Sequence, residues 1–384
     1  MRFEFASAGR IIFGDGTLNE AAPLAAIMGS RAFVVTGRNT TRVLSLLDQM
    51  ESQKIKTTSF SVSREPTTDM VLEGAAKARE TGCDLVIGFG GGSVIDTGKA
   101  VAALLANPGD ILDYLEVIGK ARPLAASPAP YIAIPTTSGT GAEVTRNAVL
   151  LSPGHKLKVS MRSALMLPRA AVVDPVLTCS LPPDVTASTG LDALTQLIEP
   201  FLSNKANPLT DGICREGILR AARSLKRAYE DGYDISARRD MAIASLFGGL
   251  ALANAGLGAV HGFAGPLGGM FPAPHGAICA RLLPYVMEAN HLALKARDPE
   301  SPSLARFDDL AKILIGFASA TAQDGVSWIK DLCSFLRVPP LSRFGVKQEH
   351  IPDIVEKSEN SSSMKSNPIT LNREELEGIL YYAL

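Results

Sequence analysis

The first half of the chain alternates short continuous apolar runs with longer amphipathic segments. The runs predict strands at Phe3–Phe5, Arg10–Phe13, Ala32–Thr36, Thr57–Val62, Asp84–Gly88 and Tyr131–Ile134. Helices are predicted between them at Leu18–Met28, Thr40–Gln53, Thr68–Thr81 and Ser93–Leu105. Continuous apolarity is typical of strands buried on both faces of a parallel sheet. We therefore predict an open α/β sheet covered by helices, with ligands bound beyond the carboxyl ends of its strands.

Helical periodicity dominates the second half of the chain, where no convincing series of strands follows residue 180. The predicted helices are Asp184–Leu202, Asp211–Asp231, Ser236–Ala255, Ser303–Thr321, Gly325–Leu336 and Glu374–Leu384. Asn372 and Glu375 form a potential capping box at the start of the last helix. We expect an α/β domain over residues 1–180 and an all-α domain over 181–384, with the boundary near Leu177–Pro183.

Composition narrows the class of protein. A chain of 384 residues favours two domains, and 46% hydrophobic with 20% charged residues is ordinary for a globular protein. A net charge of −1 without long runs of one sign favours neither nucleic acid nor an anionic membrane as a partner. The N-terminus lacks a secretory signal, and apolar runs such as Ala100–Ala106 are too short to span a membrane. The five cysteines are widely spaced, which favours neither disulfides nor a structural zinc knot, and we expect a cytoplasmic protein.

Two loops rich in glycine and hydroxyl groups follow predicted strands. Gly90–Ser93 opens a helix, so its free backbone N–H groups and small residues suit a phosphate, although a tight turn would use the same residues. Pro135–Glu143 carries four hydroxyl groups and two glycines, which suit phosphate, ribose or amide groups, although it also fits a polar turn. Two such loops at one edge of a sheet support the prediction of a nucleotide site.

The stretch Asn254–Ala277 holds two of the five histidines, His261 and His275, on either side of a bend rich in glycine and proline. Imidazole is a common metal ligand and a common acid or base. Asp192, Gln196 and Glu199 fall on one face of a predicted helix. The alternatives are two unrelated histidines and a solvated helix face. The small, weakly charged residues around Asp192 favour a buried site.

Taken together, these motifs resemble the iron-containing (group III) alcohol dehydrogenase family, which is related to glycerol dehydrogenase and more distantly to dehydroquinate synthase. The motifs are GGGSVIDTGKA at 90–100, IPTTSGTGAEVT at 134–145, GLDAL at 190–194, the two histidines, and SSSMKSNPITLNREEL at 361–376. The resemblance implies a Rossmann-like N-terminal domain, a helical C-terminal domain, and NAD(P) with a divalent metal in the cleft between them.

The resemblance also implies roles for particular residues. The implied cofactor contacts are Gly91, Gly92, Ser93, Asp96, Thr136, Thr137, Thr140, Asn147 and Lys158. The implied metal ligands are Asp192, His261 and His275, together with the residue at 196. Cofactor choice depends on the stretch Gly37, Arg38, Asn39 and Thr40. Many members that prefer NAD carry an acid where Gly37 stands here, and Arg38 suits a 2′-phosphate, so the sequence slightly favours NADP.

Two positions depart from the family pattern. Gln196 stands where metal-dependent members have a histidine, and its amide oxygen is a weaker ligand for Fe2+ or Zn2+. Gly265 stands where a histidine proposed to relay protons is often found. The metal site is therefore either weakened, or absent as in maleylacetate reductases, in which case His261 or His275 would donate the catalytic proton.

We therefore expect an NAD(P)-dependent oxidoreductase that interconverts an alcohol and an aldehyde or ketone by hydride transfer. His261 and His275 are the expected catalytic residues, and Asp192, Gln196, His261 and His275 the expected metal set. The expected partners are a small-molecule alcohol or carbonyl substrate and a second copy in a homodimer. A metal-independent reductase and a non-redox nucleotide-binding homologue are the alternatives.

Overall fold

In the computed structural model, which describes residues 2–384, the chain folds into two compact units. The sheet unit comprises Ser7–Thr137 and Gly141–Cys179, and the helical unit comprises the chain up to Ala6, Ser138–Thr140 and Ser180–Leu384. The fold is a six-stranded parallel α/β domain followed by an all-helical domain, as predicted from the sequence.

Six parallel strands form the sheet unit's main sheet in the order β1-β8-β5-β4-β2-β3. The strands are β1 (Ile11–Phe13), β2 (Arg31–Gly37), β3 (Lys56–Val62), β4 (Leu85–Gly90), β5 (Tyr131–Pro135) and β8 (Ala170–Val173). Because β4 lies between β2 and β5 and all three are parallel, their carboxyl ends meet at one edge.

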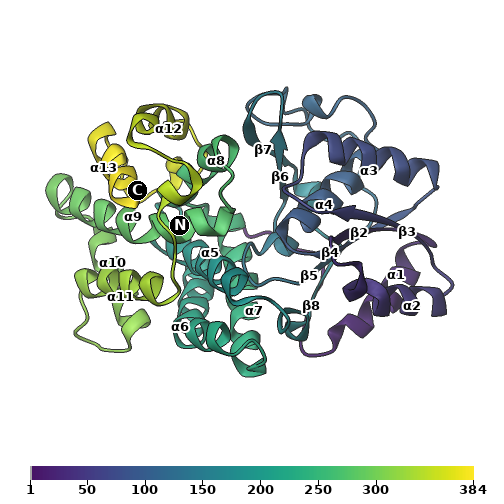
Figure 1. Cartoon of the computed structure of the whole chain (residues 1–384), viewed down its shortest axis with the longest axis horizontal. Coiled ribbons are helices and arrows are strands. Elements are labelled where there is room, and N and C mark those ends of the chain that lie inside the picture. The colour runs from purple at the N-terminus through teal and green to yellow at the C-terminus, as the bar shows by residue number, and fades with distance from the viewer. Residues whose placement is uncertain (1) are drawn as a thin grey trace. The chain divides into compact units, whose positions relative to one another are not determined.

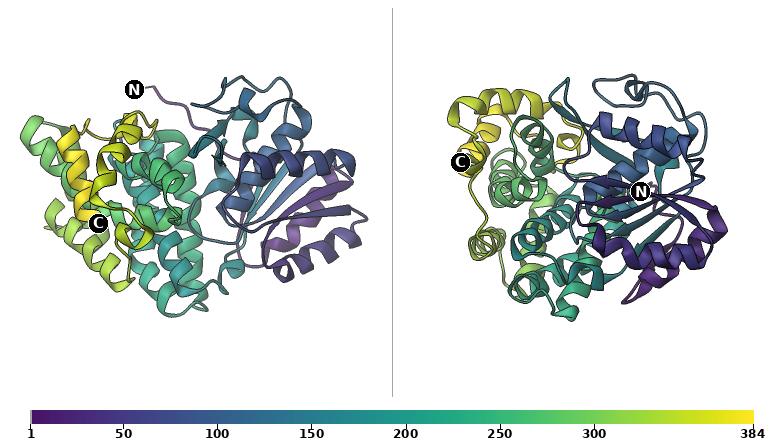
Figure 2. Two further views of the ribbon diagram at one scale, coloured as in Figure 1. Left: turned by 45° about the horizontal axis from the view of Figure 1, so that its top comes forward. Right: turned by 45° about the vertical axis from the view of Figure 1, so that its right-hand side comes forward.

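Helices cover both faces of this sheet, and the alternation of side chains along β2 explains how (Figures 1 and 2). Phe33 and Val35 belong to the core that faces α3 (Thr68–Glu80) and α4 (Gly92–Ala106). Val34 points to the opposite face, and the helices there are α1 (Ala21–Met28) and α2 (Leu44–Ser52). All three β2 side chains are fully buried, as continuous apolarity predicts.

An antiparallel hairpin of β6 (Asn147–Ser152) and β7 (Leu157–Arg162) forms a second, two-stranded sheet that the sequence analysis did not predict. In β6, Ala148 and Leu150 are buried while Val149 is exposed, which is the period of a half-buried strand. Single 3-10 turns lie at Thr17–Glu20, Thr40–Val43, Ile111–Asp113, Ala142–Val144, Ala164–Met166, Pro175–Thr178, Leu341–Phe344, Gln348–His350 and Met364–Ser366.

Nine helices make up the helical unit within the described residues. They are α5 (Pro183–Leu202), α6 (Pro208–Glu230), α7 (Ile235–Ala255), α8 (Ala259–Met270), α9 (His275–Arg297), α10 (Pro302–Ile315), α11 (Ala322–Phe335), α12 (Ile351–Glu359) and α13 (Arg373–Ala383). Helix α5 lies among α6, α7 and α9, and every residue from Gly190 to Leu202 is buried. Polar side chains on α5 therefore face protein atoms, and the solvated-face alternative is wrong.

Two local predictions need correction, and one is confirmed. Phe3–Phe5 forms no strand, because the segment joins the helical unit, where Ala6 exchanges hydrogen bonds with the Asn254 side chain. The helix predicted over Ser303–Thr321 ends at Ile315, since Gly316 adopts a left-handed φ of 83°. Strand β8 and helices α8, α9 and α12 were not predicted. The capping box of Asn372 and Glu375 is present.

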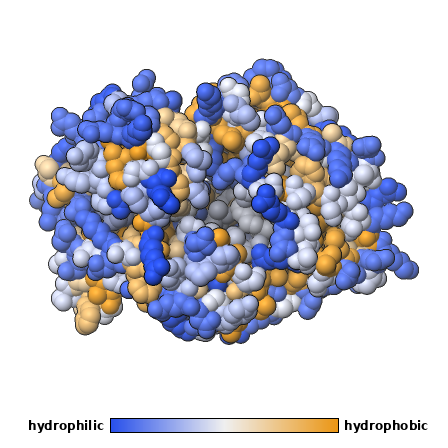
Figure 3. All heavy atoms as spheres, viewed as in Figure 1, coloured by the Kyte–Doolittle hydropathy of each residue, from blue (hydrophilic) through white to orange (hydrophobic). Residues whose placement is uncertain are grey.

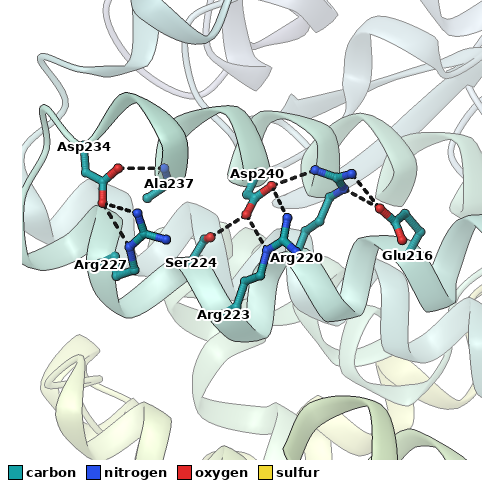
Figure 4. A network of polar contacts seen from close by, with 8 residues as sticks. All are labelled: Glu216, Arg220, Arg223, Ser224, Arg227, Asp234, Ala237 and Asp240. Carbon is teal, nitrogen blue, oxygen red and sulfur yellow. Dashed lines mark hydrogen bonds and ion pairs between the residues drawn. The ribbon is translucent and has the colours of Figure 1, made fainter. Parts of the chain in front are cut away.

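A network of ionic contacts joins α6 to α7 around Asp240 (Figure 4). The Asp240 carboxylate accepts hydrogen bonds from Arg220, Arg223 and Ser224 at 2.7–2.8 Å, although only 8% of its side chain is exposed. Burial alone would raise the pKa of Asp240, but the donors from Arg223, Ser224 and Arg220 outweigh it and lower the pKa. The network therefore stabilises the packing of two helices that also flank α5.

Exposed hydrophobic residues form small groups among hydrophilic ones on the face drawn in Figure 3. Within residues 2–384 no single helix has both the length and the apolar composition needed to cross a membrane. The pair α7 and α8, bent by 100° at the break between them, meets that length and composition only when taken together.

We predict that Asp240→Ala weakens the helical unit, because it leaves two arginines without their buried partner. The expected loss is about 2 kcal/mol, between the values for exposed and buried pairs, or a fall of roughly 5 °C in the thermal midpoint. Glu377→Ala, which removes only the exposed pair with Arg373, is the matched control and should lower the midpoint by less than about 2 °C. Circular dichroism melts of both variants provide the measurement, and equal shifts would contradict the prediction.

Candidate active site

The sheet unit brings three of the predicted cofactor segments to one edge. Gly37 ends β2 and is followed by the exposed Arg38 and Asn39, while Gly91 follows β4 and Thr136 follows β5. The Thr136 N–H donates to the Gly90 carbonyl at 2.9 Å, which joins the second and third segments. The carboxyl edge of a parallel sheet is where such folds bind ligands.

Helix α4 begins at Gly92, so the N–H groups of Gly92 and Ser93 point out of its first turn. A side chain at Gly91 would meet Thr137 at 3.3 Å, and the bare backbone therefore stays accessible beside the second loop. Thr36 at the end of β2 is 1% exposed, yet its hydroxyl has no hydrogen-bond partner among the described residues. A buried, unpartnered hydroxyl at this edge suits a bound nucleotide.

Asp96 and Asn147 lie where the α4 helix meets the β6–β7 hairpin. Asp96 accepts the Val149 N–H at 3.0 Å, and its other oxygen lies 3.7 Å from Lys99 Nζ. Lys99 is fully buried, and its ammonium group also donates hydrogen bonds to two carbonyl oxygens, that of Ala142 at 2.8 Å and that of Asn147 at 2.6 Å. These contacts fix the loop after β5 to α4, and they already occupy the Asp96 carboxylate.

Two other predicted cofactor residues, Lys158 and Thr140, belong to strand β7 and to the helical unit, respectively. Lys158 lies on β7, where its ammonium group is 3.1 Å from Glu65. Thr140 belongs to Ser138–Thr140, the short segment assigned to the helical unit. Gly139 explains that assignment, because a side chain there would come within 2.8 Å of Thr189 on α5.

Glu143 is a buried carboxyl that the sequence analysis did not single out. It lies in the 3-10 turn after β5 and is 2% exposed. Burial raises its pKa to about 7, although Lys99 acts in the opposite direction. The loop that follows β5 therefore contains a group that titrates near neutral pH.

The helical unit brings the predicted metal residues together from three helices. Asp192 comes from the buried middle of α5, His261 from the first turn of α8 and His275 from the start of α9. Gly276 allows the close approach, since a side chain there would lie 2.4 Å from the Ser188 carbonyl on α5. The two histidines thus lie on different elements joined by a bend, as predicted.

Four potential ligand atoms converge at this point, from Asp192, His261, His275 and Cys279, all within 4.8 Å of one another. Nε2 of His261 and Nε2 of His275 lie 3.5 and 3.6 Å from Asp192 Oδ1. Cys279 Sγ lies 3.6 Å from His275 Nε2 and 3.8 Å from His261 Nε2. Asp192 and Cys279 are buried, whereas the His275 side chain is 34% exposed.

Glu199 orients His261. Its Oε2 lies 2.6 Å from His261 Nδ1, and its Oε1 accepts the Val260 N–H at 2.7 Å at the start of α8. A carboxylate at Nδ1 places the proton there, which leaves Nε2 as a free ligand atom facing Asp192. Asn367, from the C-terminal motif, holds the same end of α8 by accepting the Ala259 N–H at 3.1 Å.

The electrostatics of the cluster suit a cation. Burial alone would raise the pKa of Asp192, but His275 and His261 outweigh it and lower the pKa. Burial alone would lower the pKa of His261, but Cys279, Glu199 and Asp192 raise it well above its ordinary value. The pKa of His275 is likewise raised, by Cys279 and Asp192, against the effect of burial. The surroundings of the two imidazoles therefore stabilise positive charge at this site.

Two orphaned acceptors show that the residues fit a metal ion. Asp192 Oδ1 and Gln196 Oε1 are buried and have no hydrogen-bond partner among the described residues. A buried oxygen without a donor is costly unless something else satisfies it, and a divalent cation does so. The donor set of carboxylate, imidazoles and thiol is one that Fe2+ and Zn2+ accept.

Cys279 was not predicted as a ligand, because the five cysteines show no metal-binding pattern among themselves. His275 and Cys279 are four residues apart on α9, the same spacing as Asp192 and Gln196 on α5. That spacing puts both side chains on one helix face and was available as a signal. At Gly265, by contrast, a side chain would meet no atom within 4 Å, so that position is open.

Comparisons with known proteins cover almost the whole chain. Residues 8–175 match the family described as "Iron-containing alcohol dehydrogenase", and residues 186–384 match "Fe-containing alcohol dehydrogenase family, C-terminal". Alcohol dehydrogenase 4 of Schizosaccharomyces pombe is 34% identical over 380 residues, which cover 97% of this chain and 87% of that protein.

Solved structures give the same result. A crystal structure of 1,3-propanediol oxidoreductase matches with a TM-score of 0.93 and 30% identity, and 100% of each chain is covered. Sulfoacetaldehyde reductase from Bifidobacterium kashiwanohense, solved in complex with NAD+, matches with a TM-score of 0.88 and 28% identity. That match covers 100% of this chain and 99% of the reductase.

We predict that Glu143→Gln changes how stability depends on pH. The folded pKa of about 7 exceeds the unfolded value of about 4.3, so the folded wild type holds the proton more tightly. The free energy of unfolding therefore falls by roughly 4 kcal/mol as pH rises between these two pKa values, and it is constant above them. The variant should lose less stability between pH 4 and pH 8, as thermal midpoints will show. Glu73→Gln, on the exposed side of α3, is the control, and a wild-type profile for Glu143→Gln would disprove the prediction.

We predict that Glu199→Gln weakens metal binding without removing a ligand. An amide N–H facing His261 Nδ1 moves the ring proton to Nε2, which is the atom that faces Asp192. Affinity for Zn2+ should fall roughly 10–100-fold in competition with a chromophoric chelator. Glu230→Gln, at the exposed end of α6, should bind like the wild type. An unchanged affinity in Glu199→Gln would show that Glu199 does not orient the ligand.

Proposed function

Because this chain belongs to the iron-containing alcohol dehydrogenase family of oxidoreductases, which use NAD(P) and a divalent metal, we propose that it interconverts an alcohol and an aldehyde or ketone by metal-assisted hydride transfer. One observation carries the metal-assisted version. A buried, unpartnered oxygen of Asp192 lies where two imidazoles and a thiol already converge.

In this proposal the sheet unit binds the cofactor at the edge formed by Gly37–Asn39, Gly91–Ser93 and Thr136–Thr137. Support comes from the shared edge of their strands, the first turn of α4 and the unpartnered Thr36 hydroxyl. Lys99 positions the loop after β5, and Asp96 positions the β6–β7 hairpin. Asn147, Lys158 and Thr140 remain proposed contacts.

The residues that follow β2 support a slight preference for NADP over NAD. No acid follows Thr36, so nothing there repels a 2′-phosphate. Arg38 is exposed next to Gly37, where a guanidinium group is available to pair with that phosphate. Asn39 has its side-chain oxygen engaged by the Thr41 N–H and hydroxyl, so it shapes the turn.

In the helical unit, Asp192, His261 and His275 would hold the divalent metal, either Fe2+ or Zn2+. When bound, NAD(P) would supply or accept the hydride, and the metal would supply Lewis acidity toward the substrate oxygen. Glu199 keeps His261 Nε2 directed at the cluster. His275 is the ligand that reaches solvent, with a 34% exposed side chain, so substrate oxygen and protons approach from its side.

We predict that chelation abolishes the activity of the purified protein with an alcohol and aldehyde panel, and that Fe2+ or Zn2+ restores it. Loss of a Lewis acid worth several kcal/mol predicts at least about a 100-fold fall in kcat/KM. Assays with NADH and NADPH in parallel also measure the preference for the cofactor. Binding of NADPH, followed by fluorescence, should persist in the stripped protein because the sheet unit supplies its contacts.

Two results would overturn the proposal in different ways. Full activity of metal-free protein would identify a metal-independent reductase that uses His261 or His275 as the proton donor. Binding of NADPH without turnover of any alcohol, aldehyde, ketone or oxo-acid in the panel would identify a non-redox nucleotide-binding homologue.

A further inference from the structure

We propose that Cys279 binds the metal as a thiolate and takes the place of the histidine that is absent at position 196. The inference rests on the proposed metal site and specifies its fourth protein ligand. Cys279 lies four residues after His275 on α9, and its side chain is fully buried. The ligand set then becomes one carboxylate, two imidazoles and one thiolate.

The position of Sγ supports this assignment. Sγ lies 3.6 Å from His275 Nε2 and 3.8 Å from His261 Nε2, and these imidazole atoms lie 3.6 and 3.5 Å from Asp192 Oδ1. Four of the six distances among these atoms are therefore 3.5–3.8 Å, and the other two are at most 4.8 Å. Such spacings suit one cation bound at about 2.0–2.3 Å from each ligand, as in a zinc site.

Gln196 has a different part in this arrangement. Its side chain hydrogen-bonds to Asp192, which helps to lower the pKa of that carboxyl. A neutral amide oxygen is a weaker ligand than a thiolate for a borderline metal such as Zn2+. Gln196 therefore positions Asp192, and Cys279 supplies the charge and the soft ligand.

The thiolate has consequences for metal choice. Thiolate ligands favour Zn2+ over harder cations such as Mg2+ and Mn2+, whereas carboxylates and water suit those cations. Formation of the bond between Sγ and the metal releases the thiol proton to the buffer. Metal uptake by the whole protein should therefore release protons and should discriminate strongly against Mg2+.

Cobalt replacement tests the proposal. The full-length protein is stripped of metal and titrated with Co2+, which reports a thiolate ligand through a near-ultraviolet charge-transfer band. Wild type should show this band, and Cys279→Ser should bind Co2+ without it and hold Zn2+ roughly 100-fold more weakly. Cys333→Ser is the matched control, because Cys333 is also buried in the helical unit but donates to the Ala280 carbonyl. That variant should keep the band.

X-ray absorption of the zinc-loaded wild type keeps the test independent of how the variants fold. It should show one sulfur at about 2.3 Å with nitrogen and oxygen ligands. A bound metal with only nitrogen and oxygen neighbours would overturn the role of Cys279 while leaving the dehydrogenase proposal intact. A sulfur ligand in a protein that catalyses no hydride transfer would confirm the role of Cys279 and overturn the dehydrogenase proposal. Failure of the wild type to bind Co2+ or Zn2+ would overturn the metal site itself.

Discussion

A buried carboxylate in the middle of α5, that of Asp192, is the charge around which the metal cluster is arranged. Every residue of α5 from Gly190 to Leu202 is buried, so Asp192 has no access to bulk water. An isolated charge in such a place would neutralise itself or demand a counter-charge. Two imidazoles from α8 and α9 lie 3.5 and 3.6 Å from Asp192 Oδ1, and this oxygen still has no hydrogen-bond partner, which leaves room for a cation.

The need of buried charges for partners also explains contacts that support the two predicted sites, one in each unit. In the helical unit, Glu199 and Asn367 hold the start of α8, which fixes His261 in position. In the sheet unit, the buried Lys99 satisfies two backbone carbonyls and stands near Asp96. Each buried charge thus fixes a loop that would otherwise move relative to its helix. The predicted cofactor edge and the metal cluster are both built on rigid elements by such contacts.

Much of this architecture could be read from the sequence, and the exceptions have physical causes. Continuous apolar runs identified β2, β4 and β5, because strands buried on both faces leave that pattern. The β6–β7 hairpin escaped notice because each strand has only six residues, and apolar and polar positions alternate only in β7. Phe3–Phe5 forms no strand, and the adjacent Ala6 pairs instead with the distant side chain of Asn254.

The candidate metal ligands, too, could be predicted from the sequence only in part. His261, His275 and Asp192 were found from residue type and the family resemblance, and the structure brings them together. Cys279 was overlooked, although its spacing from His275 places it on the same face of α9. Glu199 was placed on the polar face without a role, because its partner, His261, lies 62 residues away in the chain. Contacts over such distances have no local signature in a sequence.

The pairing of Ala6 with Asn254 also bears on how the protein is made. These residues are 248 positions apart, yet both belong to the helical unit. During synthesis the N-terminal segment leaves the ribosome long before its partner exists, while the whole sheet unit between them emerges and is free to fold first. The helical unit therefore reaches its final form only after translation of its later helices, and a fragment beginning at Ser180 would lack a piece of its own structure.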